Sequence, residues 1–184
     1  MTPKYTITAA RPQDVTRLTA IELAAARLLV GFAPESVLNE TTSLDLLEQA
    51  QREERLWVAL DDDVPVGFAH LEVIERDAIH LEEIDVHPSH GRRGLGTKLI
   101  CHVCEWATGK GYGAVTLTTF RDVPWNLPFY SRVGFAVVPP EQVSASLRAI
   151  VEDETCRGLD PSRRVVMKRG LTNRAPVTSV IYTS

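Results

Sequence analysis

Residues 84–96, with the sequence IDVHPSHGRRGLG, carry the strongest structural signal in this chain. Ile84 and Val86 alternate with polar residues, which is typical of a β-strand with one buried face. His87 and Pro88 end that strand. Apolar residues then recur at positions 95, 99, 103 and 106, and this spacing predicts an amphipathic helix. The stretch therefore predicts a strand that leads through a glycine-rich turn into a helix.

The turn between this strand and this helix has the features of an anion-binding site. The first N–H groups of a helix have no partner inside it, and the helix dipole places positive charge at the same end. Glycines there allow positive φ angles and a close approach of phosphate to the backbone. Neighbouring arginines add positive charge. We therefore expect a di- or polyphosphate to bind at Arg92, Arg93, Gly94, Leu95, Gly96 and Thr97.

Two common phosphate-binding loops do not match this turn. A Walker loop needs Gly-Lys-Ser/Thr, whereas the order here is Gly96-Thr97-Lys98. A dinucleotide-binding turn needs a third glycine where this chain has Leu99, and it usually follows the first strand of its unit. At least three strands are predicted before this turn. The phosphate ligand is therefore expected to belong to another class.

The whole chain predicts one α+β domain over residues 1–170, followed by a tail or arm over residues 171–184. Alternating or β-branched segments predict strands at 5–9, 56–61, 64–74, 78–86, 113–119, 134–138 and 163–168. Helical periodicity and capping residues predict helices from residue 12, at 43–54, 95–109, 124–132 and 141–154. Because strands follow one another directly, a mixed sheet is favoured over a regular parallel one.

Composition argues against several classes of protein. The net charge of −4 leaves no general basic surface for nucleic acid. No basic and apolar leader opens the chain, and no apolar run approaches the roughly 18 residues of a membrane span. The three cysteines favour a reducing compartment over a disulfide scaffold. We expect a cytoplasmic protein that binds neither nucleic acid nor a membrane.

A metal site is also not expected. Cys101 and Cys104 have CxxC spacing, but they lie in the middle of a predicted helix and no second ligand pair has suitable spacing. The five histidines are scattered, without an HExxH pairing. The cysteines are therefore interpreted as buried or partly buried structural residues.

Val86-His87-Pro88 followed by Gly94-Leu95-Gly96 resembles the signature of the GNAT superfamily of N-acetyltransferases. Gly91 departs from it, since Gln or Arg is usual there, and the two following arginines are expected to compensate. Residues 126–135, NLPFYSRVGF, resemble the family's late motif Tyr-x-x-x-Gly-Phe. Residues 57–59 and 65–69 are similar to its central hairpin. The resemblance implies an acyl-CoA N-acyltransferase fold with a central, mostly antiparallel sheet flanked by helices.

The resemblance also implies direct transfer of the acetyl group from acetyl-CoA to an amine, without an acyl-enzyme. Backbone N–H groups near Ile84, Asp85 and Val86 are expected to polarise the thioester carbonyl. Tyr130 is the candidate acid, because a phenol is protonated at neutral pH. A carboxylate is needed as base, and Glu83 is favoured over Glu82, with strict alternation placing the two on opposite faces.

Some assignments stay open at this point. Asn126 is interpreted either as a cofactor contact or as the cap of a short helix; the family's cofactor-contacting Asn usually stands where this chain has Val123. The acceptor, a small-molecule or peptide amine, is expected between residues 28–42, 124–125 and 141–154. Family members often form homodimers, and one is expected here. The alternatives are a non-catalytic acyl-CoA sensor and transfer of a longer acyl group.

Overall fold

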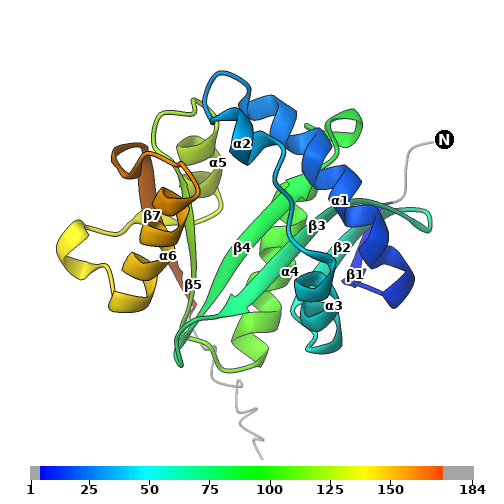
Figure 1. Cartoon of the computed structure of the whole chain (residues 1–184). Coiled ribbons are helices and arrows are strands. Elements are labelled where there is room, and N and C mark those ends of the chain that lie inside the picture. The colour runs from blue at the N-terminus through cyan, green and yellow to red at the C-terminus, as the bar shows by residue number, and fades with distance from the viewer. Residues whose placement is uncertain (1–4, 172–184) are drawn as a thin grey trace, which may run out of the picture.

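One seven-stranded mixed sheet runs through the computed structural model, which describes residues 5–171 (Figure 1). The strand order is β1-β2-β3-β4-β5-β7-β6, and only the β4–β5 pair is parallel. This confirms the predicted mixed, mostly antiparallel sheet. The strands are β1 (Tyr5–Ala9), β2 (Leu56–Asp61), β3 (Val64–Val73), β4 (Ala78–Val86), β5 (Ala114–Phe120), β6 (Ala136–Val137) and β7 (Arg164–Gly170).

Helices cover both faces of the sheet. The helices are α1 (Pro12–Ala26), α2 (Glu35–Leu38), α3 (Leu44–Arg52), α4 (Leu95–Gly109), α5 (Asn126–Arg132) and α6 (Ala145–Cys156). The short helix α2 was not predicted. Helix α6 begins later than predicted, because residues 140–142 form a separate 3-10 turn and the Ser144 hydroxyl caps the helix by accepting a hydrogen bond from the Leu147 N–H (3.2 Å).

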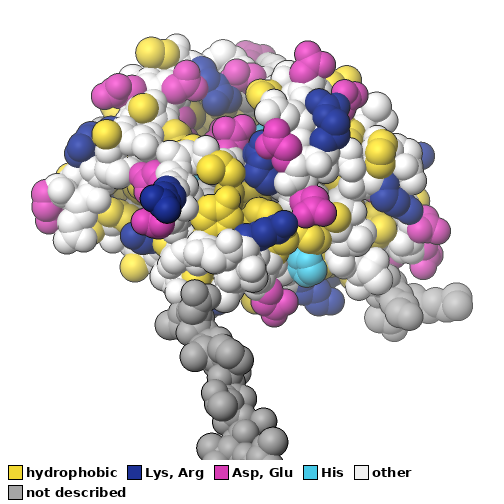
Figure 2. Space-filling view, turned by 90° about the horizontal axis from the view of Figure 1, so that it is seen from below, with side chains coloured by type: hydrophobic (Ala, Val, Ile, Leu, Met, Phe, Trp, Pro, Cys, Tyr) yellow, Lys and Arg dark blue, Asp and Glu magenta, His cyan; other side chains and the backbone are white. Residues whose placement is uncertain are grey.

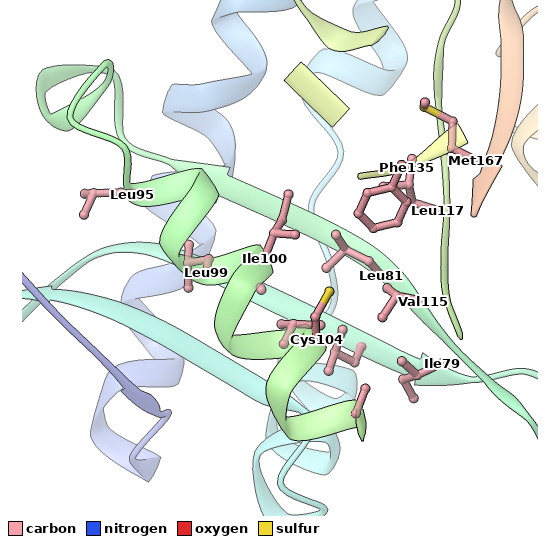
Figure 3. Close-up of a cluster of buried hydrophobic side chains, with 14 of the residues drawn as sticks. Ile79, Leu81, Leu95, Leu99, Ile100, Cys104, Val115, Leu117, Phe135 and Met167 are labelled. Carbon is pink, nitrogen blue, oxygen red and sulfur yellow. The ribbon is translucent and has the colours of Figure 1, made fainter. Parts of the chain in front are cut away.

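The larger hydrophobic core lies between α4 and the sheet. In Figure 3, Ile100 and Cys104 lie on the side of α4 that faces Leu81 and Val115 of the strands, and Leu95, Leu99 and Ile79 belong to the same buried cluster. Burying each large apolar side chain contributes about 1.5–3 kcal/mol. This packing fixes the N-terminus of α4 beside the C-terminal end of β4, where the glycine turn joins them.

A second core lies on the opposite face. Val15, Leu18 and Ile21 of α1 and Leu47 of α3 pack there against strand residues that include Phe68. Ser43, one of two candidate capping residues with Thr42, caps α3 by accepting a hydrogen bond from the Leu46 N–H (3.3 Å). In Figure 1, α1, α3 and α6 lie in front of the sheet and α4 lies behind it.

Strands β4 and β5 separate after a short paired segment. Only Ala78, Ile79 and His80 pair with β5, at Ala114 to Thr116. Figure 1 shows the two strands diverging toward the top of the view. From residue 81 onward, the edge of β4 that faces β5 therefore has no strand partner. This divergence creates the open backbone edge on which the candidate site is built.

The surface is mixed in character on the side seen from below in Figure 2, where acidic and basic side chains are interspersed around a small hydrophobic patch. Among residues 5–171, no helix is both long and apolar enough to cross a membrane. Cys104 is buried but Cys101 is exposed, so the predicted burial of both cysteines is wrong for Cys101. Position 101 lies on the solvent side of α4.

Candidate active site

The open edge of β4 presents two backbone N–H groups. The His87 N–H donates to the carbonyl of Val66 on β3 (2.8 Å), so Val86 and Gly67 form a non-hydrogen-bonded pair in that ladder. In an antiparallel ladder such residues direct their N–H groups to the other edge, and the pattern repeats every second residue. The N–H groups of Ile84 and Val86 therefore point toward the diverging β5, whereas that of Asp85 points toward β3.

The glycine turn has the conformation that an anion site requires. Gly94 has a φ of 76° and is the N-cap of α4. The Lys98 N–H donates the first helical hydrogen bond, to the Gly94 carbonyl (3.0 Å). The N–H groups of Leu95, Gly96 and Thr97 precede it and have no partner within the helix. These three donors and the positive end of the helix dipole lie just beyond the end of β4.

The two arginines of the turn differ in their surroundings. Arg93 donates to the Tyr5 hydroxyl on β1 (2.5 Å), and that hydroxyl lies 3.0 Å from Nδ1 of His90. Arg92 is exposed and has a φ of 58°. Within residues 5–171, its side chain makes no hydrogen bond or ion pair. Of the two cations that the sequence singles out, Arg92 is thus the one whose guanidinium is available to a ligand.

Helix α5 packs directly on the start of α4. A Cβ added to Gly96 would lie 3.1 Å from Cζ of Phe129, so glycine leaves room for the close approach of this ring. The Asn126 side-chain amide donates to the Thr119 hydroxyl (2.9 Å) and ties α5 to β5. The N-cap of α5 is Trp125, and hence the interpretation of Asn126 as the cap is wrong. These contacts hold Tyr130, on the same helix, beside the open edge of β4.

A β-bulge interrupts β4 near the middle of the open edge. His70 of β3 pairs with Glu83, and the next residue, Leu71, pairs with Leu81. Glu82 is therefore the extra residue on β4, and a bulge of this kind changes which face the following side chains occupy. No sequence pattern indicated this irregularity.

The bulge gathers the acidic side chains of β4 on the α1 face of the sheet. Before the bulge, Ile79 and Leu81 face the core under α4; after it, Ile84 and Val86 do. Glu83 and Asp85 therefore face α1. The strict alternation that placed Glu82 on the opposite face is wrong, because Oε2 of Glu82 lies 3.8 Å from Nε2 of His80 on this same side.

Burial and mutual repulsion perturb the acidic groups at this edge. Burial, together with the charges of Glu22 and Glu82, raises the pKa of Glu83 to about 8. Burial and the carboxyl groups of Glu83 and Glu22 raise the pKa of Asp85 well above its usual value. Burial and the carboxyl groups of Glu83 and Asp85 raise the pKa of Tyr130. The Tyr130 phenol is thus electrostatically coupled to Glu83 and stays protonated at neutral pH.

Glu22 of α1 belongs to this cluster and was missed from the sequence. Its Oε1 accepts hydrogen bonds from the Thr42 N–H (2.9 Å) and hydroxyl (3.0 Å). This carboxyl group therefore anchors the segment between α2 and α3 above β4. A signal did exist: Glu22 stands four residues after Leu18 and three before Ala25, both on the buried face of α1.

Three segments distant in sequence meet above the diverging strands. Phe32 of the α1–α2 connection stacks edge-on against Trp125, with ring centroids 5.6 Å apart. Val123 is buried and packs with Phe120 and Leu159 in a small apolar cluster. Arg157 at the end of α6 pairs with Glu40 (3.0 Å). The structure thus brings together residues 28–42 and 124–125, two of the segments from which the sequence predicted an acceptor pocket, and the chain just after α6.

Comparison with known families identifies this arrangement. The family model described as Acetyltransferase (GNAT) family matches residues 23–135, a range that includes β4, the glycine turn and α5. The chain belongs to the GNAT acetyltransferase family. The resemblance of the two sequence motifs is thereby confirmed, since both lie within the matched range.

Two curated relatives of this GNAT protein resemble parts of it. Glucosamine 6-phosphate N-acetyltransferase of Trypanosoma brucei brucei is 39% identical over 56 residues, which cover 30% of this chain and 36% of that protein. Mycothiol acetyltransferase of Stackebrandtia nassauensis is 31% identical over 103 residues, covering 54% and 33%. The matched part of the chain spans about a third of each relative's length.

Solved structures show the same fold over most of the chain. The PaiA N-acetyltransferase of Thermoplasma acidophilum, in complex with coenzyme A, has a TM-score of 0.71 at 17% identity and covers 91% of this chain and 99% of its own. N-acetylglutamate synthase of Neisseria gonorrhoeae, complexed with coenzyme A and N-acetyl-glutamate, has a TM-score of 0.69 at 18% identity, with coverages of 92% and 35%. At this identity the likeness establishes the GNAT fold.

Proposed function

We propose that this GNAT protein transfers the acetyl group of acetyl-CoA directly to a primary amine. The observation that carries the proposal is the open edge of β4. On that edge, the N–H groups of Ile84 and Val86, which have no partner on β5, lie between the glycine turn at one end and Glu83 and Tyr130 at the other. A thioester laid along this edge meets hydrogen-bond donors, an acid and a base in succession.

Acetyl-CoA fits the donor end of the site. Its pyrophosphate would accept hydrogen bonds from the N–H groups of Leu95, Gly96 and Thr97, with Arg92 as the available cation. The extended pantetheine would pair with the free edge of β4, as an added strand does. The complexes of PaiA and of N-acetylglutamate synthase with coenzyme A support this assignment. Asn126, whose side chain is held by its hydrogen bond to Thr119, is proposed to border the same acetyl-CoA site.

Glu83 is proposed as the base that accepts a proton from the ammonium group of the acceptor. The freed lone pair attacks the thioester carbonyl carbon, and negative charge develops on the oxygen. The N–H groups of Ile84 and Val86 are placed to stabilise that charge. A base with a pKa of about 8 is well matched to an amine near neutral pH. Asp85 is proposed to act only through its negative charge, which repels that of Glu83.

Tyr130 is proposed as the acid that completes the reaction. When the C–S bond breaks, the departing thiolate takes the proton of the Tyr130 hydroxyl, and free coenzyme A leaves. The raised pKa of Tyr130 keeps this proton in place until sulfur becomes negative. The nitrogen of the tetrahedral intermediate loses its second proton, which returns to the Tyr130 oxygen, and Glu83 releases its proton to solvent. The products are therefore one N-acetylated amine, one thiol and one proton, with no acyl-enzyme.

The test is turnover on a panel of primary amines with acetyl-CoA, measured by thiol release and by the mass of the product. We expect one acetylated amine for each thiol released. Tight binding of acetyl-CoA with no turnover on any amine would instead favour the acyl-CoA sensor. Comparison of the turnover of acetyl-CoA with that of longer acyl-CoA thioesters tests which length of acyl group the protein transfers. A cytoplasmic location and a homodimer stay predictions.

A further inference from the structure

His70 of β3 carries a polar ring that the proposed mechanism does not use. Its side chain is only 1% exposed, and within residues 5–171 neither ring nitrogen has a hydrogen-bond partner. Buried polar atoms without partners are rare in folded proteins, because each one costs free energy of folding. The unpartnered ring therefore singles out this position of β3.

The register of the sheet places His70 directly beside Glu83, the group proposed as base. His70 pairs with Leu56 of β2 on one side and with Glu83 of β4 on the other. Residues that oppose each other in a ladder share a face of the sheet, and their Cβ atoms lie about 4.5–5.5 Å apart. This is the α1 face, because Leu56 belongs to the core beneath α1. Of the two side chains opposite His70, only that of Glu83 can form a hydrogen bond with the ring.

Glu72 favours one position for the proton of the His70 ring. Its Oε1 lies 3.7 Å from Nε2 of His70, too far for a hydrogen bond but close enough to favour an N–H over a lone pair at that nitrogen. Burial and the nearby charge of Arg55 lower the pKa of His70 to about 4, so the ring is neutral at pH 7. A neutral imidazole has one donor and one acceptor nitrogen. With the proton on Nε2, Nδ1 is a hydrogen-bond acceptor.

The carboxyl group of Glu83 changes its hydrogen-bonding character when it takes up a proton. An ionised carboxylate only accepts hydrogen bonds, whereas the protonated group has an O–H to donate. Burial and neighbouring carboxyl groups raise the pKa of Glu83 to about 8, so both states occur near neutral pH. The titratable or charged groups that act on Glu83 are Glu22 of α1, Glu82 and Asp85 of β4, Tyr130 of α5 and Arg164 of β7. A contact with Nδ1 of His70 is therefore available to the protonated form of Glu83 alone.

We propose that His70 is a positioning residue for acetyl transfer, whose Nδ1 accepts a hydrogen bond from the protonated carboxyl group of Glu83 and holds that group toward the acceptor. This inference rests on the proposed function and adds a residue to the same site. His70 acts through Glu83 and touches neither substrate. The hydrogen bond forms when Glu83 takes a proton from the ammonium group of the acceptor, and it is lost when that proton leaves to solvent. His70 stays neutral throughout.

The first test is the pH profile of kcat/KM, measured with the amine of the panel that the wild type acetylates fastest. His70→Leu and His70→Asn are a matched pair, because both new side chains branch at Cγ and only the asparagine keeps an acceptor oxygen near the position of Nδ1. Loss of the acceptor destabilises protonated Glu83 alone. The midpoint of the profile for His70→Leu is therefore expected about one pH unit below that of the wild type.

The same pair of variants separates positioning from a structural role. The kcat of His70→Leu should fall about tenfold, because the carboxyl group is no longer held toward the acceptor. His70→Asn should keep the wild-type midpoint. Loss of a structural role alone would change the thermal unfolding temperature without moving the midpoint. If His70→Leu folds and its midpoint equals that of the wild type or lies at higher pH, the inference is overturned.

The second test does not depend on activity. Heteronuclear NMR spectra of the wild type with isotope-labelled histidine report which ring nitrogen carries the proton. At pH 7 we expect His70 to be the neutral tautomer with the proton on Nε2. A proton on Nδ1 would overturn the inference and leave the proposed function intact. Failure of the wild type to acetylate any amine would instead overturn the proposed function, and the inference with it.

Discussion

The ring of Phe129 fills the space beside Gly96, so that a Cβ on residue 96 would lie 3.1 Å from Cζ of the ring. This contact joins the first turn of α4, which is proposed to bind the pyrophosphate, to α5, which carries Tyr130. The ring of Tyr130 in turn packs edge-on against Phe129, with centroids 5.1 Å apart. The donor end and the acid end of the proposed site are therefore mechanically linked through one aromatic residue.

Gly96→Ala is expected to disturb both ends of the site at once. The added methyl group overpacks the contact with Phe129, which costs about 1–3 kcal/mol of unfolding free energy. Displacement of α5 should also reduce kcat. Gly109→Ala, in the same helix, is the control, since nothing lies within 4 Å of its added Cβ. Thermal unfolding and kcat measured together test the prediction. A fully active Gly96→Ala variant with wild-type stability would contradict it.

Tyr130→Phe is expected to lower kcat about 100-fold, because the departing thiolate loses its proton donor. The affinity for acetyl-CoA should change little, since the hydroxyl acts late in the reaction. Steady-state kinetics and calorimetric titration with acetyl-CoA separate these two effects. An unchanged kcat across a series of pH values would remove Tyr130 from the mechanism.

The two arginines of the glycine turn are expected to contribute unequally. Arg92→Ala should weaken acetyl-CoA binding about tenfold, because it removes a charge-assisted contact with phosphate. Arg93→Ala should weaken binding less, since Arg93 already donates to Tyr5. Its main effect is expected on stability. Calorimetric Kd values for the single and double variants test this order, and a larger loss of affinity for Arg93→Ala would reverse the assignment.

The stability of the protein should fall as pH rises from about 6.5 to about 8. The folded-state pKa values of Glu82 and Glu83 are raised from 4.5 to about 7 and about 8. The folded state therefore holds protons that the unfolded chain has lost, and unfolding free energy declines with pH across that window. His70 and His80, whose pKa values are lowered from 6.5 to about 4, oppose this only below about pH 6.5.

Glu83→Gln provides the comparison for this pH dependence. The amide does not titrate, so the Tm of this variant should decline less than that of the wild type between pH 6.5 and pH 8. Thermal unfolding in buffers of constant ionic strength measures the difference. Parallel Tm curves for the two proteins would show that the Glu83 pKa is not raised on folding.

The parts of the fold that follow from local sequence could be predicted. Each of these parts is specified by residues that lie close together in the sequence. They are the strand that contains Ile84 and Val86, the glycine turn and helix α4. The structure places these elements as predicted. Capping by Ser43 is equally local, because the hydroxyl and the N–H that it binds are three residues apart. Such features depend little on the rest of the chain.

The features that decide the chemistry of the site depend on contacts distant in sequence. The bulge at Glu82 arises from pairing with β3, and the sequence of β4 alone predicts regular alternation. The bond between Arg93 and Tyr5 joins residues 88 positions apart. His70 in an apolar strand resembles an ordinary core residue until its unpartnered nitrogens are seen in the fold. The tail or arm predicted for residues 171–184 lies outside the described residues, apart from Leu171.

The most direct test of the central claim is the pH dependence of kcat/KM for acetyl transfer to an amine in the wild type and in Glu83→Gln. We expect the wild-type value to rise with pH toward a plateau above about pH 8, because Glu83 must lose its proton to act as base. In the variant, kcat/KM should fall about 100-fold and lose this titration, while the acetyl-CoA Kd is retained. A variant that keeps the wild-type rate and pH profile would contradict the account.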